Sequence, residues 1–107
     1  MNTTYEVFLS EAARIDMRMI KAHLKERAGD EFALLTLEYI SHSIRRLAVF
    51  PYRFPIIDQA LNLRRMVIDK YRYSVFCEVF EETKVVRIHY IRHQAQSITV
   101  ITKGEMI

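Results

Sequence analysis

The run from Leu63 to Val79 most constrains the fold of this chain, because its side chains change character at every second position. Alternation with a period of two predicts β-strands that are covered on one face. A polar break divides the run into two strands, near 64–69 and 72–81. The sequence therefore predicts a β-hairpin at the centre of a sheet.

Two adjacent arginines open this hairpin. Arg64 shares its parity with Met66, whereas Arg65 shares its parity with Val67. Adjacent side chains of a strand leave opposite faces of the sheet. We therefore expect one arginine to support the fold while the other points outward.

The first half of the chain reads as a short strand followed by two helices. Residues 5–9 are aromatic and β-branched, and Ser10 can act as the N-cap of a helix behind them. Gly29 predicts a left-handed cap at the end of that helix, and Asp30 can cap a second one. So short a link forces the two helices antiparallel. The two apolar stripes are Ala13, Met17, Ile20, Leu24 and Ala28, and Ala33, Leu37, Ile40, Ile44 and Leu47.

Prolines 51 and 55 end the second helix, because a residue before proline avoids helical dihedral angles. A connecting loop is predicted to run to about Asn62. A last strand near 84–92 follows the polar turn 81–84, and residues 97–102 suit a terminal strand or a tail that extends onto a partner. The predicted fold class is α+β, in the order β-α-α-β-β-β, with a helical hairpin packed on a small, mostly antiparallel sheet.

The composition indicates one domain. With 107 residues, 50% of them hydrophobic, the chain can bury one core and leaves no room for a second ordinary domain. The single Cys77 stands at an apolar strand position, so we expect a buried, inert thiol in a reducing compartment. Neither a signal peptide nor a membrane-spanning run is visible, which predicts a cytoplasmic protein without membrane contact.

The surplus positive charge lies in the strand-rich half. The chain carries 16 Lys+Arg against 13 Asp+Glu, which gives a net charge of +3. Residues 1–63 hold eight groups of each sign, whereas residues 64–107 hold eight basic and five acidic groups. This asymmetry suggests an anionic partner for the second half.

Several kinds of catalytic site are disfavoured. No nucleophile-elbow sequence is present. His89 and His93 have the spacing of a metal-binding pair on a helix, but they lie in a predicted strand. With only two glycines, the chain has no glycine-rich phosphate loop. We therefore expect neither a metal site nor a cofactor.

A basic set remains on the predicted strands: Arg64, Arg65, Arg72, Arg87, Arg92 and His93. Arginine binds phosphates or carboxylates and stabilises developing negative charge. In a metal-free ribonuclease such arginines would act beside an acid/base, for which His93 is favoured over Tyr90. In the alternative interpretation, two arginines only form cross-strand ion pairs. These pairs would join Arg72 and Arg87 to Glu78, Glu81 or Glu82.

The ordered set of segments over residues 4–97 resembles the ParE/RelE superfamily. The segments that carry the resemblance are Tyr5–Ala13, Leu47–Pro51, Leu63–Arg65, Tyr71–Val79 and Val86–His93. The resemblance implies the toxin of a bacterial type II toxin–antitoxin system of the plasmid-stabilisation kind. It also implies the fold described above and a cognate antitoxin as partner in a hetero-oligomer.

The superfamily contains toxins that cleave mRNA on the ribosome and toxins that poison DNA gyrase. RelE-like cleavage uses clustered lysines and arginines with a tyrosine or histidine. Here the loop before Arg64 has no lysine, and residues 94–98 are neutral where many members carry arginines and then a tyrosine. Cys77 also stands where an aromatic residue is usual. The departures favour a gyrase inhibitor that acts by binding rather than by catalysis.

Two alternatives stay open, a ribosome-dependent mRNA endonuclease and a non-toxic homologue that only binds an antitoxin. The endonuclease would use Arg64, Arg65, Arg92 and His93. The predicted target-binding residues, whether for gyrase or for ribosome and mRNA, are Arg64, Arg65, Arg87, Arg92 and His93. The antitoxin is expected across the helical hairpin and a sheet edge, on the apolar residues Phe50, Tyr52 and Phe54.

Overall fold

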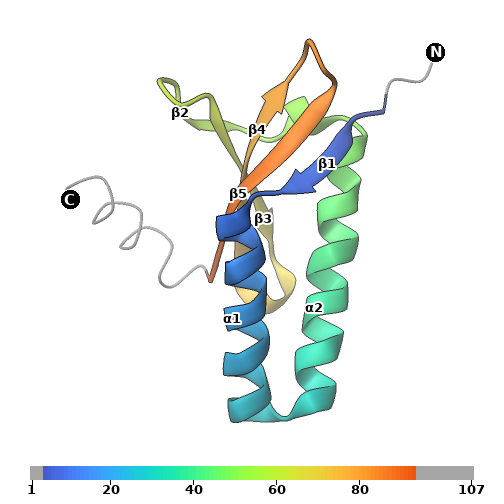
Figure 1. The fold of residues 1–107 in the computed structure, drawn as a ribbon, viewed down its shortest axis with the longest axis vertical. Helices are drawn as coiled ribbons and strands as arrows, with labels where there is room; N and C mark the ends of the chain where they lie inside the picture. The colour runs from blue at the N-terminus through green and yellow to red at the C-terminus, as the bar shows by residue number, and fades with distance from the viewer. Residues whose placement is uncertain (1–3, 94–107) are drawn as a thin grey trace.

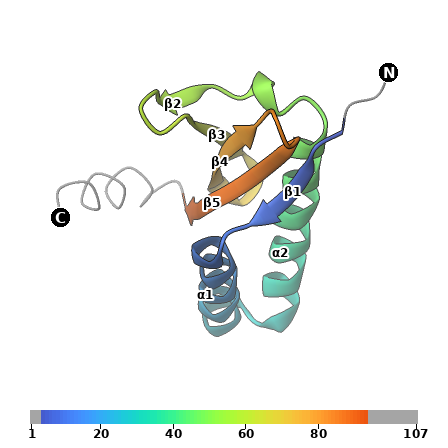
Figure 2. The same cartoon turned by 45° about the horizontal axis from the view of Figure 1, so that its top comes forward.

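The alternating run forms two neighbouring strands in a computed structural model that describes residues 4–93. Two helices lie on one face of a five-stranded sheet (Figures 1 and 2). The helices are α1 (Glu11–Ala28) and α2 (Asp30–Arg45), with 3-10 turns η1 (Arg46–Ala48), η2 (Pro51–Arg53) and η3 (Lys70–Arg72). The strands are β1 (Glu6–Leu9), β2 (Ile56–Asp58), β3 (Leu63–Ile68), β4 (Tyr73–Phe80) and β5 (Val85–His93).

The sheet has the order β1-β5-β4-β3-β2. β1 runs parallel to β5, and the other neighbours are antiparallel. The predicted hairpin is β3 and β4, with β4 as the central strand. The α+β class and the mostly antiparallel sheet are therefore confirmed, and the strands begin and end within one residue of their predicted bounds except in the loop after α2.

The predicted loop up to Asn62 was wrong in part, because it contains the strand β2. Ile56 pairs with Arg64, and the backbone N–H of Arg65 donates to the carbonyl of Pro55 over 3.0 Å. The β-branched pair at Ile56 and Ile57 suits an extended backbone, and the position of β2 at the sheet edge tolerates the preceding proline. Residues 97–102, for which a strand or a tail was expected, lie outside the described residues.

The helical hairpin begins as predicted, since the hydroxyl of Ser10 accepts the N–H of Ala13 over 3.0 Å. Asp30, however, is not a cap. Gly29 is the only residue between the helices, so it caps both of them, and Asp30 lies in the first turn of α2. The φ of Gly29 is 94°, the positive value expected of a capping glycine, but its ψ of 167° is extended rather than left-handed helical.

The core lies between the helices and the sheet. Its buried members are Ala13, Ile40, Ile44, Leu47, Met66, Ile68, Tyr73, Val75, Cys77, Val79, Val86, Ile88 and Ile91. Ala28 was expected in the buried stripe but is exposed, because the tip of the hairpin extends beyond the sheet (Figure 1). Leu47 is buried as expected, although it belongs to η1 rather than to α2. Burial raises the pKa of the Cys77 thiol to about 11, as expected of an inert cysteine.

A β-bulge interrupts β5 opposite β4. Phe76 faces Tyr90 while the next residue, Cys77, faces Ile88, so His89 is an extra residue in β5. The bulge explains why Ile88 and Ile91 both join the core although their parity differs. Simple alternation would have turned Ile91 away from the helices.

Candidate functional site

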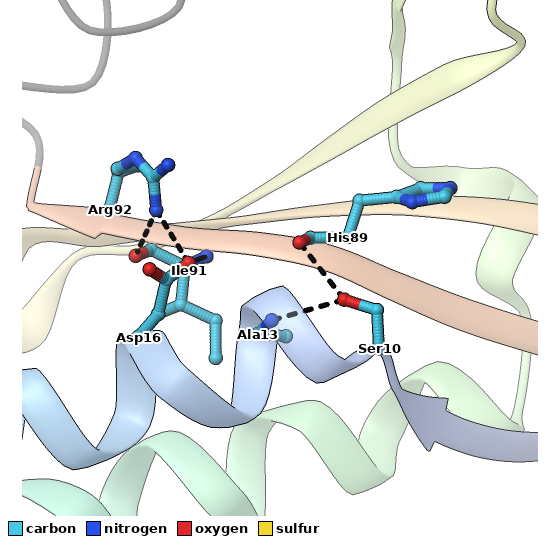
Figure 3. Close-up of polar contacts among 6 residues, drawn as sticks. All are labelled: Ser10, Ala13, Asp16, His89, Ile91 and Arg92. Atoms are coloured by element: carbon cyan, nitrogen blue, oxygen red, sulfur yellow. Dashed lines mark hydrogen bonds and ion pairs between the residues drawn. The ribbon is translucent and has the colours of Figure 1, made fainter.

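The bulge is held by polar side chains of the first helix and of its N-cap (Figure 3). The hydroxyl of Ser10 donates to the carbonyl of His89 over 3.2 Å, and the carboxylate of Asp16 accepts the N–H of Ile91 over 3.0 Å. These groups belong to a part of β5 that β1 does not cover, since the β1 pairing ends at Ile88. Ser10 and Asp16 therefore supply the hydrogen bonds that the backbone of β5 lacks beyond the end of β1.

Arg92 is part of the same arrangement. Its guanidinium lies 2.5 Å from the Asp16 carboxylate and also donates to the carbonyl of Ile91, with the ion pair mostly shielded from solvent. The guanidinium lies 5.0 Å from the centroid of the Tyr90 ring. Of the predicted target-binding residues, Arg92 thus has a clear structural task, which is to fix the end of β5 to α1.

We expect Asp16→Ala to lower the free energy of unfolding by about 1–3 kcal/mol, because it leaves the Arg92 guanidinium and a strand N–H without their acceptor. Urea denaturation at neutral pH measures this change. Asp30→Ala is the control, since it removes a carboxylate whose ion pair with Lys25 is exposed. That variant should lose less than about 1 kcal/mol. Equal losses in the two variants would contradict the role given to Asp16.

The paired arginines separate as the alternation predicts. Arg64 turns to the helix side, where its guanidinium donates to the carbonyls of Tyr52 over 3.1 Å and of Phe54 over 2.6 Å. It also lies 4.9 Å from the centroid of the Tyr52 ring. Arg65 leaves the opposite side of β3, and its side chain has no hydrogen bond or ion pair with any residue in 4–93. Arg64 supports the loop after α2, and Arg65 is available to a partner.

We call the side of the sheet opposite α1 and α2 the outer face. Its residues alternate with core residues of the same strands, and they include Glu6, Phe8, Arg65, Val67, Glu78, Arg87, His89 and Tyr90, with Ser74 and Phe76 buried among them. His89 points away from α1 in Figure 3, and its ring nitrogen lies 3.0 Å from the Glu78 carboxylate. This pair is half-buried and joins β4 to β5.

The alternative interpretation, in which Arg72 and Arg87 form cross-strand ion pairs, was wrong. Neither arginine forms an ion pair with any residue between 4 and 93. Although Glu78 faces Arg87 in the register, its carboxylate is taken by His89. Arg87 therefore lies on the outer face without a carboxylate partner, like Arg65.

The residues predicted to bind an antitoxin surround η2. Phe50 is 70% exposed and has a positive φ of 58°, a conformation that costs a non-glycine residue energy and turns the ring to solvent. Phe54 packs partly against the core. The hydroxyls of Tyr5 and Tyr52 donate to one oxygen of Glu81 over 2.8 and 2.7 Å. Glu81 therefore ties the loop after α2 and the start of β1 to the β4–β5 turn.

Glu81 makes this tie dependent on pH. The ammonium of Lys84 and then the two tyrosine hydroxyls lower the pKa of Glu81 from 4.5 to about 2, and the bond to Glu81 raises the pKa of Tyr52 to about 12. Because the pKa is depressed in the folded protein, the stabilisation is present above pH 4.5 and is lost as the pH falls toward 2. Glu81→Gln should therefore flatten the dependence of the melting temperature on pH between those values. If the melting temperature of this variant fell with pH as steeply as that of the parent protein, the role given to Glu81 would be wrong.

A groove lies between the helices and the end of β5, and we call it the helix–sheet groove. It has a volume of about 910 Å³. Its lining comprises Asp16, Met19, Ile20, His23, Leu24, Arg27, Phe32, Thr36, Tyr71, Tyr73, Ile91, Arg92 and His93. His93 lies here with its ring edge-on to Tyr73 at 5.2 Å between centroids. Sequence reasoning missed the groove; the signal was the apolar residues Met19 and Phe32 outside the expected buried stripes.

The predicted ribonuclease set is thus divided. Arg65 is on the outer face, Arg64 is bound to the loop after α2, and His93 is in the groove with Arg92 at the groove's edge. Within residues 4–93, no three His, Cys, Asp or Glu side chains gather closely enough to hold a metal ion. No helix in this part of the chain is long and apolar enough to cross a membrane.

The arrangement of two helices on one face of a five-stranded sheet is shared with solved structures. A chain of the chromosomal ParDE toxin–antitoxin system from P. aeruginosa matches with a TM-score of 0.75 and 17% identity, covering 86% of this chain and 98% of that one. E. coli RelE in the free state, in a mutant form, matches with a TM-score of 0.62 and 13% identity over 97% and 98% of the two chains. A chain of the RelBE2 toxin–antitoxin complex of Mycobacterium tuberculosis matches with a TM-score of 0.59 and 16% identity, covering 89% of this chain and 97% of that one.

The sequence shows to which family within this fold the chain belongs. The profile of the family described as "ParE toxin of type II toxin-antitoxin system, parDE" matches residues 7–98. The chain therefore belongs to the ParE toxin family and is the toxin of a type II toxin–antitoxin system. No curated protein sequence matches it. The resemblance to the ParE/RelE superfamily and the preference for its ParE-like branch are confirmed.

Proposed function

We propose that this toxin inhibits DNA gyrase by binding it through the outer face of its sheet, and that a cognate antitoxin neutralises it by occupying the helix–sheet groove. The observation that carries the gyrase assignment is the separation of the ribonuclease candidates. Arg65 and His93 leave different sides of the sheet, and Arg64 and Arg92 are engaged within the fold. The family match to ParE toxins supports the same choice.

The outer face suits a binding inhibitor. Arg65 and Arg87 emerge from β3 and β5, on either side of the central strand, without carboxylate partners in the described chain. Unpaired surface arginines steer association with an acidic surface and contribute to it directly. Within the described residues, the Glu78 carboxylate of this face lies 3.0 Å from the His89 ring and forms no ion pair with either arginine.

The decisive experiment is a supercoiling assay with purified gyrase, relaxed plasmid and increasing amounts of the toxin. We expect supercoiling to fall and cleaved DNA to accumulate at micromolar protein. Unaltered supercoiling without cleaved DNA would overturn the gyrase assignment and leave a non-toxic antitoxin-binding protein as the better description.

A ribosome-dependent mRNA endonuclease is the second candidate function. The observation that favours it is the position of His89 on the outer face. Glu78 orients the His89 ring, and His89 stands two positions after Arg87 in the chain. A histidine held by a carboxylate can exchange protons during phosphodiester cleavage. Toeprinting of a translated mRNA tests this candidate, and we expect no toxin-dependent cuts. Cuts that disappear in His89→Ala would favour the endonuclease over the gyrase inhibitor.

The chemistry of the helix–sheet groove supports an antitoxin partner of a defined kind. The groove is apolar along Met19, Leu24 and Phe32, and its charged lining consists of Arg27 and Arg92 against Asp16. An amphipathic segment with acidic residues beside its apolar face fits such a lining. Phe50 and Tyr52 lie near the opposite end of β5, beside the β4–β5 turn, and could contact a second segment of the same partner.

Co-expression with the neighbouring gene tests this partner. We expect a stable complex of the toxin with a small acidic protein after purification in high salt. A toxin that remains monomeric in the presence of that protein would contradict the antitoxin assignment. Three of the solved complexes that share the fold are toxin–antitoxin pairs, from P. aeruginosa, M. tuberculosis and Pyrococcus horikoshii, which supports the expectation.

A further inference from the structure

We propose that the outer face binds single-stranded DNA directly, through Arg65 and Arg87 and the exposed rings of Phe8 and Tyr90. This inference rests on the proposed function, because an inhibitor that traps cleaved DNA on gyrase has broken strands beside it. It adds a ligand to that function, since binding gyrase alone would require no contact with DNA.

The first step of the argument is the state of the cations. Arg65 and Arg87 form no ion pair within the described residues, and the carboxylate of Glu78, which faces Arg87 in the register, is held by His89. Register places Arg65 opposite Phe76, and Arg87 opposite Glu78, two residues further along β4. Strand spacing and rise then separate the two arginine backbones by about 12 Å. Two arginines carried on backbones at this separation suit two phosphates of one nucleic-acid strand better than a single small anion.

The second step is the placement of the aromatic rings. Phe8 is 49% exposed and faces Arg87 in the register of β1 and β5. Tyr90 is 38% exposed and lies in the same cross-strand row as Arg65, because both face Phe76. Each unpaired arginine therefore has an exposed ring in its own row, and the Tyr90 ring is already backed by the Arg92 guanidinium. Alternating rings and cations on a sheet form the usual platform for stacked bases and their phosphates.

The third step selects a single strand rather than a duplex. In a duplex the flat faces of the bases are covered by their neighbours, so Phe8 and Tyr90 would gain no stacking partner. Every unpaired base offers a ring face, and stacking of this kind tolerates any sequence. The pattern on the outer face therefore predicts binding that depends on salt and on strandedness but only weakly on sequence.

A fluorescence titration tests the proposal. The chain contains no tryptophan, so Phe8→Trp places a single reporter on the outer face. Titration with an oligodeoxythymidylate of about 12 nucleotides should quench this tryptophan with a dissociation constant of about 1–100 µM near physiological salt. In the same background, Arg65→Glu with Arg87→Glu should weaken binding at least tenfold. The slope of log K against log salt should fall by about 1.4, which is about 0.7 for each lost phosphate contact.

Arg18→Glu with Lys21→Glu is the matched control, because it changes the net charge equally through exposed residues of α1. We expect its affinity to stay within twofold of the parent protein. Equal weakening by the control pair, absence of quenching at 100 µM oligonucleotide in low salt, or equal affinity for a duplex would each overturn the proposal. Tighter binding of oligouridylate than of oligodeoxythymidylate would also overturn it, in favour of RNA. Gyrase takes no part in this titration, so the two proposals can fail separately. Gyrase inhibition without oligonucleotide binding would refute only the DNA contact. Oligonucleotide binding without gyrase inhibition would refute only the proposed target.

Discussion

A toxin carrying Arg65→Glu and Arg87→Glu is expected to need at least tenfold more protein than the parent for half-maximal inhibition of gyrase supercoiling. Both residues leave the outer face without carboxylate partners in the described chain, so each reversal removes an attraction and introduces a repulsion. The fold should persist, because neither side chain makes a hydrogen bond or ion pair within residues 4–93. Titration of the variant in the supercoiling assay measures the effect.

Two control variants separate a loss of gyrase binding from effects of net charge and of stability. Arg18→Glu with Lys21→Glu should inhibit like the parent, since these cations stand on the first helix, away from the outer face. Arg64→Glu should also lose inhibition, but together with stability, because Arg64 holds the carbonyls of Tyr52 and Phe54. Full inhibition by a stably folded Arg65/Arg87 variant would show that gyrase is bound elsewhere.

The second large effect is expected in the helix–sheet groove. Met19→Asp should weaken the antitoxin complex by more than a hundredfold, because it places a charge in the apolar part of the groove, where truncating a central contact already costs about 2 kcal/mol or more. Met19 is 63% exposed in the free toxin, so the substitution should leave its melting temperature nearly unchanged. Isothermal titration calorimetry with the purified antitoxin measures the loss.

Leu34→Asp is the matched control for the groove. Leu34 is an apolar residue of α2 that is 55% exposed and does not line the groove. This variant should bind the antitoxin with unchanged affinity. If both variants bind like the parent, the antitoxin must use another surface, and the exposed loop at Phe50 becomes the first alternative.

Local features of the fold could be predicted from the sequence because neighbouring residues decide them. The alternation through β3 and β4 placed Arg64 and Arg65 on opposite faces, and Ser10 was recognised as a cap from its position before an apolar stripe. The burial of Cys77 followed from the same parity argument. The ordered segments also identified the superfamily, which the family match confirms.

Features that depend on distant segments could not be predicted in this way. The bulge at His89 needs Ser10 and Asp16, which satisfy its backbone from α1, and nothing in the β5 sequence marks the extra residue. By changing the parity of β5, the bulge turns His93 toward the helices and Arg92 toward the other side, the reverse of what simple alternation predicts. The groove likewise combines side chains of both helices with those of β4 and β5, so it becomes visible only when the helices are packed on the sheet.

The parallel pairing of β1 with β5 has a consequence for the timing of folding. Ser10 and His89 touch although they are 79 positions apart, and among the strands of residues 4–93 only β5 pairs with β1. Contacts between such distant positions form late, because the chain entropy of closing a long loop must be met first. While the chain is still being made, β1 has to wait until residues 85–88 have left the ribosome. The row that contains Phe8 and Arg87 therefore forms only after the segment up to β5 has been made, so the outer face is completed later than the helical hairpin.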